Sequence, residues 1–376
     1  MIGIITRFTE FPLRQRDTIR SLVVRFVLQT GEDYLNNNNN VNMDIDPFVT
    51  TFLDSLRRDI LDMITDRRTD ENGYRGLDST RDTDAEVATM LRFFPMNLVS
   101  HIAIGPYNFY PLQCLLHLKC NFKAVPFVPI LASVAIDLNL FEKNQRGGLL
   151  DEDPFGEGLN ALSVLATVSF LLDRRLRDVV MFRVLVRLRQ LGLFVKEDIQ
   201  QFKLVNTLCK GIFFKEDTFQ FLVQWDPSAL LIEDERGHLP LHWAATTSTN
   251  NYHKFRIVFE SYITYYPLKV GIGCLFRTRF GRPRKRTSIG IACRNNQTAT
   301  AVDIVESILN QAVIKLDMVE AMGMTAIDAT IHVSGTYFLF RMNPALFIEN
   351  LVSQEAVTET VAVDEAAAPL LPSIHT

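Results

Sequence analysis

The feature that most constrains this chain is a short string, Asp234 to Ala245, in which turn-forming residues lead directly into a helix start. Gly237 can adopt the positive φ of a tight turn, and Pro240 suits the first position of a helix, where its missing N–H is not needed. Leu241 begins a buried stripe, and the ring of His242 can bond the turn. The string therefore predicts a turn followed by a closely packed helix. Its structural residues are Gly237, Pro240, Leu241, His242, Ala244 and Ala245.

Weaker copies of this helix start recur along the chain. Tyr110-Pro111-Leu112 repeats the proline and leucine, and Gly158 to Ala161 repeats the glycine and alanine. The equivalent positions, 50, 79, 48 and 38 residues apart, are Pro111, Ala161, Pro240, Ser288 and Ala326. The longest interval fits two units of about 40 residues. Because a single helical hairpin cannot bury its apolar face alone, this recurrence predicts stacked repeats.

The string from Asp234 to Ala245 resembles the signature of an ankyrin repeat, in which a turn glycine precedes a Thr-Pro-Leu-His-x-Ala helix start. Leu239 stands where the family has threonine, so we expect a weaker start because the hydroxyl cap is missing. The resemblance implies an all-α, ankyrin-like helical repeat solenoid. The intervals between the copies are longer than the ankyrin period of about 33 residues, so the turns of this solenoid would be long and irregular.

The composition along the chain predicts four parts. They are an N-terminal helical segment with an Asn-run loop (1–65), a polar linker (66–86), the degenerate repeat array (87–351) and a disordered tail (352–376). The first part contains an i, i+4 ladder that indicates a helix: Phe48, Phe52, Leu56, Ile60 and Ile64. The linker is dense in Asp, Arg, Thr and Gly, so we expect a solvated loop there.

The overall composition is that of a folded protein. Hydrophobic residues make up 47% of the chain and its net charge is −4, which excludes wholesale disorder and makes the whole chain a poor binder of polyanions. Five scattered cysteines without a CxxC pair are typical of a reducing compartment and do not favour a zinc site. We interpret Cys114 and Cys120, which lie in an apolar stretch with His117, as small buried side chains, and a metal or redox role is the alternative. We expect no signal peptide and a cytoplasmic location, with the nucleus as an alternative.

Three apolar stretches raise the question of membrane binding. Leu98 to Leu118 and Ala124 to Phe141 contain prolines and polar residues, so we interpret both as buried helical segments punctuated by turns and expect no membrane span. Leu171 to Phe194 is the clearest helix and carries six arginines. Its predicted apolar stripe consists of Leu172, Leu176, Val179, Val180, Val184, Leu188 and Leu191. We interpret it as a core helix with a solvated face, and a membrane surface or a calmodulin-like partner is the alternative.

The resemblance to ankyrin repeats implies a surface that binds another protein, whose identity the sequence does not give. Candidate contact residues lie at the turn of the best unit, namely Glu235, Arg236 and His238. The alternative is that they are ordinary solvated turn residues. The function predicted on this basis is that of a non-catalytic protein–protein interaction scaffold or adaptor.

A basic segment suggests the second function. No acidic residue occurs from Ser261 to Val302, and the segment's partner-binding candidates are Arg277, Arg279, Arg282, Arg284, Lys285 and Arg286. Gly281 and Pro283 break any helix, so we expect an exposed loop or β-finger. Such a loop can be plainly solvated, or bind an acidic protein or an import receptor, or contact nucleic-acid phosphates. The alternative function is therefore a nuclear or nucleic-acid-associated adaptor.

Catalytic motifs are absent from the sequence. It contains no GxGxxG after a strand, no GxxxxGK[ST], no HExxH and no GxSxG. The acidic cluster Asp151 to Asp153 lacks the ligand alternation of a calcium loop, so a solvated turn is favoured. We therefore predict no enzyme activity, no cofactor and no metal.

Overall fold

The computed structural model describes residues 2–36, 46–66, 75–104, 106–116, 122–152, 159–167, 174–246, 252–266, 269–277 and 287–295, with positions 301, 303–305, 307 and 308. These residues are mostly helical, which confirms the predicted all-α class, and they include one two-stranded antiparallel sheet. The Asn run after residue 36, Ala326 and the predicted tail lie outside the described residues. Contacts divide the chain into two compact units, residues 1–198 (unit 1) and 199–376 (unit 2).

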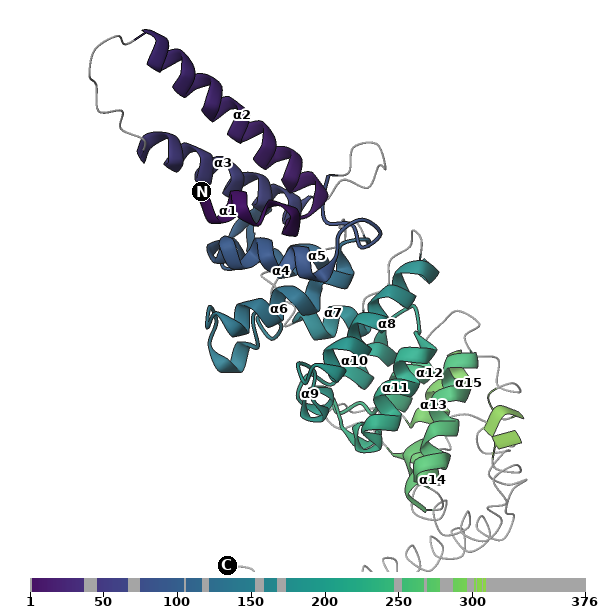
Figure 1. The fold of residues 1–376 in the computed structure, drawn as a ribbon. Helices are drawn as coiled ribbons and strands as arrows, with labels where there is room; N and C mark the ends of the chain where they lie inside the picture. Colours follow the sequence, from purple (N-terminus) through teal and green to yellow (C-terminus); the bar gives the residue numbers. More distant parts are fainter. Residues whose placement is uncertain are drawn as a thin grey trace, which may run out of the picture. The chain divides into compact units, whose positions relative to one another are not determined.

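Unit 1 is built from helices and one short hairpin of strands (Figure 1). Its α-helices are α1 (Ile2–Thr6), α2 (Leu13–Asn36), α3 (Asp46–Thr65), α4 (Asp84–Phe93), α5 (Pro111–Leu116), α6 (Val128–Asp137), α7 (Ala161–Thr167) and α8 (Arg174–Gln190). Its 3-10 helices are η1 (Phe8–Glu10), η2 (Pro95–Leu98), η3 (Val125–Phe127) and η4 (Lys143–Gln145), and its strands are β1 (Ile102–Ile104) and β2 (Tyr107–Phe109). The boundary between the two units falls inside α9 (Lys196–Gln201) rather than at a predicted domain boundary.

The N-terminal helices confirm the predicted ladder. Phe52, Leu56, Ile60 and Ile64 are almost completely buried in α3. Their spacing of four residues keeps them on one face of a helix with 3.6 residues per turn. Helix α3 packs against α2, and Figure 1 shows the two helices side by side as an antiparallel pair.

The predicted solvated loop at 66–86 is wrong for Leu77, Asp78 and Asp82, which are buried, whereas residues 79–81 are exposed as expected. Leu77 has no exposed surface and Asp82 is only 4% exposed. The Asp82 carboxylate accepts the backbone N–H of Asp78 at 2.9 Å, and the Asp78 carboxylate accepts that of Thr80 at 2.9 Å. Acidic residues can be buried in this turn because backbone donors satisfy their oxygens. Residues 67–74 of the predicted linker lie outside the described residues.

The interpretation of Leu98 to Leu118 as helical is wrong in its centre. Strands β1 and β2 pair there in antiparallel register, with Ile102 opposite Phe109 and Ile104 opposite Tyr107. Isoleucine and aromatic residues favour strands, and the Gly-Pro sequence between them disfavours a continuous helix. The prediction for the next stretch is confirmed, because α6 buries most of its residues. No helix among the described residues has both the length and the apolarity needed to cross a bilayer.

Helix α8 confirms the long helix predicted near 171–194, with a different buried stripe. Val184 and Leu188 are buried as expected, whereas Leu176 is 53% exposed and Val179 is 43% exposed. The arginine face is partly engaged, since Arg187 forms an ion pair of 2.6 Å with Asp84 at the start of α4. The predicted stripe is therefore buried in its centre and exposed at both ends, since Leu191 is also 48% exposed.

Unit 2 consists of short helices packed side by side (Figure 1). They are α10 (Leu204–Lys210), α11 (Glu216–Trp225), η5 (Pro227–Leu231), α12 (Pro240–Thr246), α13 (Tyr252–Tyr265), α14 (Lys269–Phe276) and α15 (Ser288–Asn295). Helices α10 and α11 form one hairpin, and α12 and α13 form the next. Helix α12 also packs against both α10 and α15. The core of this unit contains Phe219, Phe255, Phe259 and Tyr262, each fully or almost fully buried.

Four of the five predicted helix starts are confirmed. Helices α5, α7, α12 and α15 begin at Pro111, Ala161, Pro240 and Ser288. The long interval between Ala161 and Pro240 contains the start of a further short helix, α10, at Leu204. That start follows Lys203, whose φ of 47° lies in the left-handed region. The sequence offers neither proline nor glycine at this point, so no local signal indicated it.

Candidate functional site

The best-matching string folds as the predicted tight turn. The backbone N–H of Gly237 donates to the carbonyl oxygen of Asp234 at 3.0 Å, and the N–H of Asp234 donates to that of His238 at 3.0 Å. Gly237 has a φ of 71°, a region that residues with a Cβ adopt only with strain. The turn therefore needs glycine at this position.

The carboxylate of Asp234 organises the turn from inside. One oxygen accepts the backbone N–H groups of Arg236 at 2.9 Å and His238 at 2.8 Å. The other accepts the indole N–H of Trp243 at 2.9 Å. Burial raises the pKa of this carboxyl, but these hydrogen bonds and the nearby His238 outweigh it and lower the pKa below its ordinary value. Asp234 therefore stabilises the turn in its ionised form.

His242 connects the start of α12 to the segment after α14. Its Nδ1 accepts the backbone N–H of Leu239 at 3.1 Å, and its Nε2 lies 3.0 Å from the carbonyl oxygen of Arg277. Because Nδ1 accepts, Nε2 carries the proton and donates to that carbonyl. The imidazole has no exposed surface. His242 thus satisfies the N–H of Leu239 at the cap position, whereas the weaker start expected from the missing hydroxyl at Leu239 stays a prediction.

The other confirmed helix starts use related bonds between the residue before the helix and the third residue of the helix. Either the third side chain accepts the backbone N–H of the preceding residue, or the preceding side chain accepts the N–H of the third residue. The donor–acceptor pairs are Tyr110 to Gln113 at 2.9 Å, Ser163 to Asn160 at 2.9 Å, and Gly290 to Thr287 at 3.1 Å. Sequence reasoning missed these caps, because different residue types supply the same bond.

The remaining structural residues of the string lie where they were predicted. Pro240 is the first residue of α12. Leu241 and Ala245 have no exposed surface, and Ala244 is 1% exposed. Small side chains let α12 approach its neighbours α10 and α13 closely.

Of the predicted contact residues at the turn, two are exposed and one is not. Glu235 and Arg236 lie at the surface, and Lys203 forms an ion pair with Glu235. His238 is only 1% exposed, and its ring lies 4.5 Å from that of Trp243. The prediction that His238 contacts a partner is therefore corrected, because its ring is enclosed by the turn that it helps to hold.

Arg277 is the one member of the predicted basic group among the described residues. Its guanidinium forms an ion pair of 2.9 Å with Glu233, and its carbonyl oxygen accepts from His242. The members that lie outside the described residues are Arg279, Arg282, Arg284, Lys285 and Arg286. The nucleic-acid alternative, which needs these side chains, stays a prediction.

Charged side chains of both signs thus surround the turn of unit 2. We call this set the turn surface, and it consists of Lys203, Glu233, Glu235, Arg236 and Arg277. Its members offer charge-assisted hydrogen bonds in both directions. Among the described residues, no three His, Cys, Asp or Glu side chains gather in a way that could hold a metal ion. Cys114 is buried and unbridged, as predicted, and so are Cys209 and Cys274, whereas Cys120 lies outside the described residues.

Comparisons of the chain with protein-family models, with curated proteins and with solved structures found no match.

Proposed function

We propose that the helical hairpins within residues 87–351 are degenerate ankyrin-like repeats and that the protein acts by binding another protein, without catalysis. The contact between His242 and the carbonyl of Arg277 carries this proposal. It links the helix start of one hairpin to the chain that follows the next helices, as expected when successive hairpins stack and share a core.

The turn surface is the part of this array that we assign to recognition. The Asp234 carboxylate and the His242 ring hold the backbone of the turn, while Glu235 and Arg236 remain exposed at its tip. Because the backbone of the turn is already fixed, it loses little conformational entropy on binding, which favours specific recognition of a complementary protein surface.

Cross-linking with quantitative mass spectrometry in native cells tests this assignment. The test variant exchanges the two charges at the tip, Glu235→Lys with Arg236→Glu. The control exchanges an exposed pair on α13, Arg256→Glu with Glu260→Arg, which are bonded at 2.7 Å. Neither exchange changes the net charge. We expect the test variant to lose partners that the control keeps, whereas an identical set of partners for both variants would contradict the assignment.

The absence of catalysis is tested separately by following thermal unfolding in the presence of nucleotides or divalent metals. We expect no ligand-specific rise in the melting temperature. A large rise with one ligand would show selective binding to the folded state and would favour an enzyme.

A further inference from the structure

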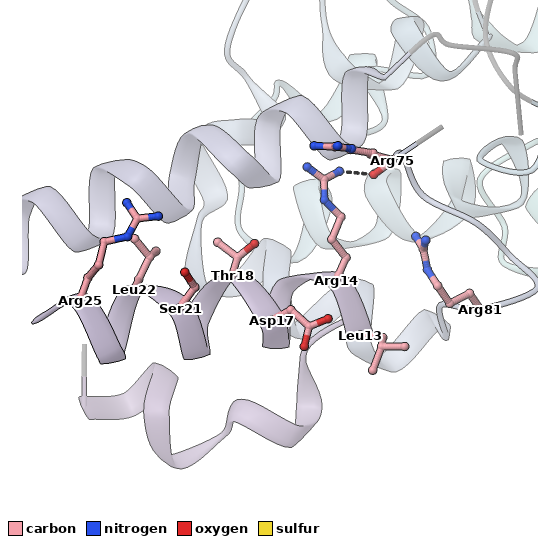
Figure 2. A pocket seen from close by; sticks show the side chains of 9 residues that line it. All are labelled: Leu13, Arg14, Asp17, Thr18, Ser21, Leu22, Arg25, Arg75 and Arg81. Atoms are coloured by element: carbon pink, nitrogen blue, oxygen red, sulfur yellow. Dashed lines mark hydrogen bonds between the residues drawn. The ribbon is translucent and has the colours of Figure 1, made fainter. Parts of the chain in front are cut away.

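Unit 1 contains an open groove of about 570 Å³ along the first half of α2 (Figure 2). Four of its lining residues are arginines, two from α2 and two from the segment before α4: Arg14, Arg25, Arg75 and Arg81. The lining also includes one acidic residue, Asp17, which forms an ion pair of 3.2 Å with Arg20. The lining therefore carries an excess of positive charge.

Two of the four arginines are engaged by other groups of unit 1. Arg14 forms an ion pair of 2.9 Å with Asp59. It also donates to the carbonyl oxygen of Arg75, and Figure 2 shows this second bond. The guanidinium of Arg81 binds both carboxylate oxygens of Asp82, at 2.9 and 2.8 Å. The bond from Arg14 links α2 to Arg75, whereas Arg81 binds its own neighbour in the chain.

The other two arginines of the groove remain available to bind a ligand. Arg25 and Arg75 are exposed, and neither guanidinium forms an ion pair with any described residue. A guanidinium presents five N–H donors in a planar fork that matches a carboxylate. The groove thus has free donors from both of its walls.

The rest of the lining indicates the class of ligand. Leu13, which is 52% exposed, and Leu22 add apolar surface, and Ser21 adds a hydroxyl. Arg14 and Arg25 lie about 16 Å apart along the helix axis, which corresponds to about five residues of an extended peptide. The described lining has no aromatic ring on which a base could stack, and Asp17 opposes a continuous phosphate backbone. An acidic peptide with apolar residues fits better than a nucleic acid.

We propose that this groove binds an acidic peptide segment of a partner protein, with Arg25 and Arg75 donating to its carboxylates. Arginine clusters are a recurrent means of recognising acidic motifs. This site lies in unit 1 and is independent of the turn surface in unit 2, so either assignment can fail without the other.

Fluorescence anisotropy on the full chain tests the proposal. The probe is a labelled ten-residue peptide of Asp, Glu and Leu, compared with the same peptide in which Asn and Gln replace the acids. We expect only the acidic peptide to bind and its affinity to fall as salt is added, because exposed charges are screened. The double variant Arg25→Glu with Arg75→Glu should weaken binding by at least about tenfold.

The matched control reverses two exposed arginines of unit 1 that do not line the groove, Arg58→Glu with Arg183→Glu. It makes the same change in net charge, and we expect it to alter affinity less than about twofold. The neutral pair Arg25→Gln with Arg75→Gln repeats the test with less perturbation of folding, which circular dichroism monitors. Equal loss in test and control variants, or no binding of the acidic peptide, would overturn the proposal. Tighter binding of single-stranded oligothymidine that depends on Arg25 and Arg75 would also overturn it.

Discussion

His242 donates from Nε2 to the carbonyl oxygen of Arg277, 35 residues further along the chain, while its Nδ1 accepts the N–H of Leu239. One buried imidazole therefore completes a helix start and ties it to a distant segment. Because each ring nitrogen has a fixed role, the ring is needed in one neutral tautomer.

Replacing His242 with alanine should lower the free energy of unfolding by about 2–4 kcal/mol, since it leaves a buried donor and acceptor unpaired and opens a cavity. Urea denaturation followed by circular dichroism measures this. The matched control is His253→Ala on α13, where an exposed histidine lies 2.9 Å from Glu216. That control should change stability by less than about 0.5 kcal/mol. Equal effects of the two substitutions would contradict the structural role of His242.

Substituting Gly237 with alanine should destabilise the protein by about 1 kcal/mol, because alanine is strained at a φ of 71°. The comparison is Gly273→Ala within α14, where an added Cβ meets nothing within 4 Å. Alanine should be neutral or stabilising there because of its higher helix propensity. An equal change in melting temperature for both variants would contradict the requirement for glycine at position 237.

Because Asp234 is ionised in the folded protein, the free energy of unfolding should depend on pH in the acid range. Its pKa is lowered in the folded state, so its contribution is fully present above its unfolded pKa near 3.8 and is lost as pH falls through the lower folded value. We expect the stability difference between the wild type and Asp234→Asn to shrink as pH falls below about 4. Urea denaturation at pH 7 and at pH 3 measures it. A difference that is the same at both pH values would contradict the carboxylate's role.

Because Lys254 is buried, the free energy of unfolding should depend on pH in the alkaline range. The side chain has no exposed surface, and its Nζ donates to the carbonyl of Gly211 at 2.9 Å. Burial lowers the pKa of this amine below 10.5, with a smaller opposing effect from Cys209. The cost of burying its charge is therefore present below the folded pKa and is relieved as pH rises toward the unfolded value. We expect Lys254→Met to gain stability relative to the wild type at pH 7, and this gain to narrow by pH 10. A gain that grows with pH would contradict this account.

The basic segment after Arg277 has its own test. One variant replaces Arg282, Arg284 and Lys285 with neutral residues. If the protein acts through the turn surface, this variant should cross-link to the same set of partner proteins as the wild type. The nucleic-acid alternative instead requires affinity for a DNA or RNA pool that falls steeply with salt and is lost on neutralisation. Absence of a salt dependence would remove that alternative.

Helix starts could be predicted from sequence wherever a local signal marked them. Proline at positions 111 and 240 cannot donate an N–H and suits a first helical turn, and both open helices. The start of α10 at Leu204 has no such residue. Lys203, which precedes it, adopts the left-handed conformation in which glycine is the usual residue, so no signal in the sequence marked this start.

Burial of polar residues was the main feature that local sequence could not reveal. Asp82 and His238 were assigned to solvated turns because of their residue type, yet both are buried. Their partners are backbone groups and nearby side chains, such as the guanidinium of Arg81 for Asp82 and the carboxylate of Asp234 for His238, which no spacing rule describes. The ring bonds of His242 were expected from the sequence, but their partners, the N–H of Leu239 and the carbonyl oxygen of Arg277, were not.

The central physical claim is that successive hairpins of unit 2 share one core and are tied together through His242. Hydrogen–deuterium exchange of the full chain carrying His242→Ala tests it most directly. We predict faster exchange in residues 239–246 and also in 269–277 and 288–295, with α3 of unit 1 unchanged. Faster exchange confined to 239–246 would contradict the claim.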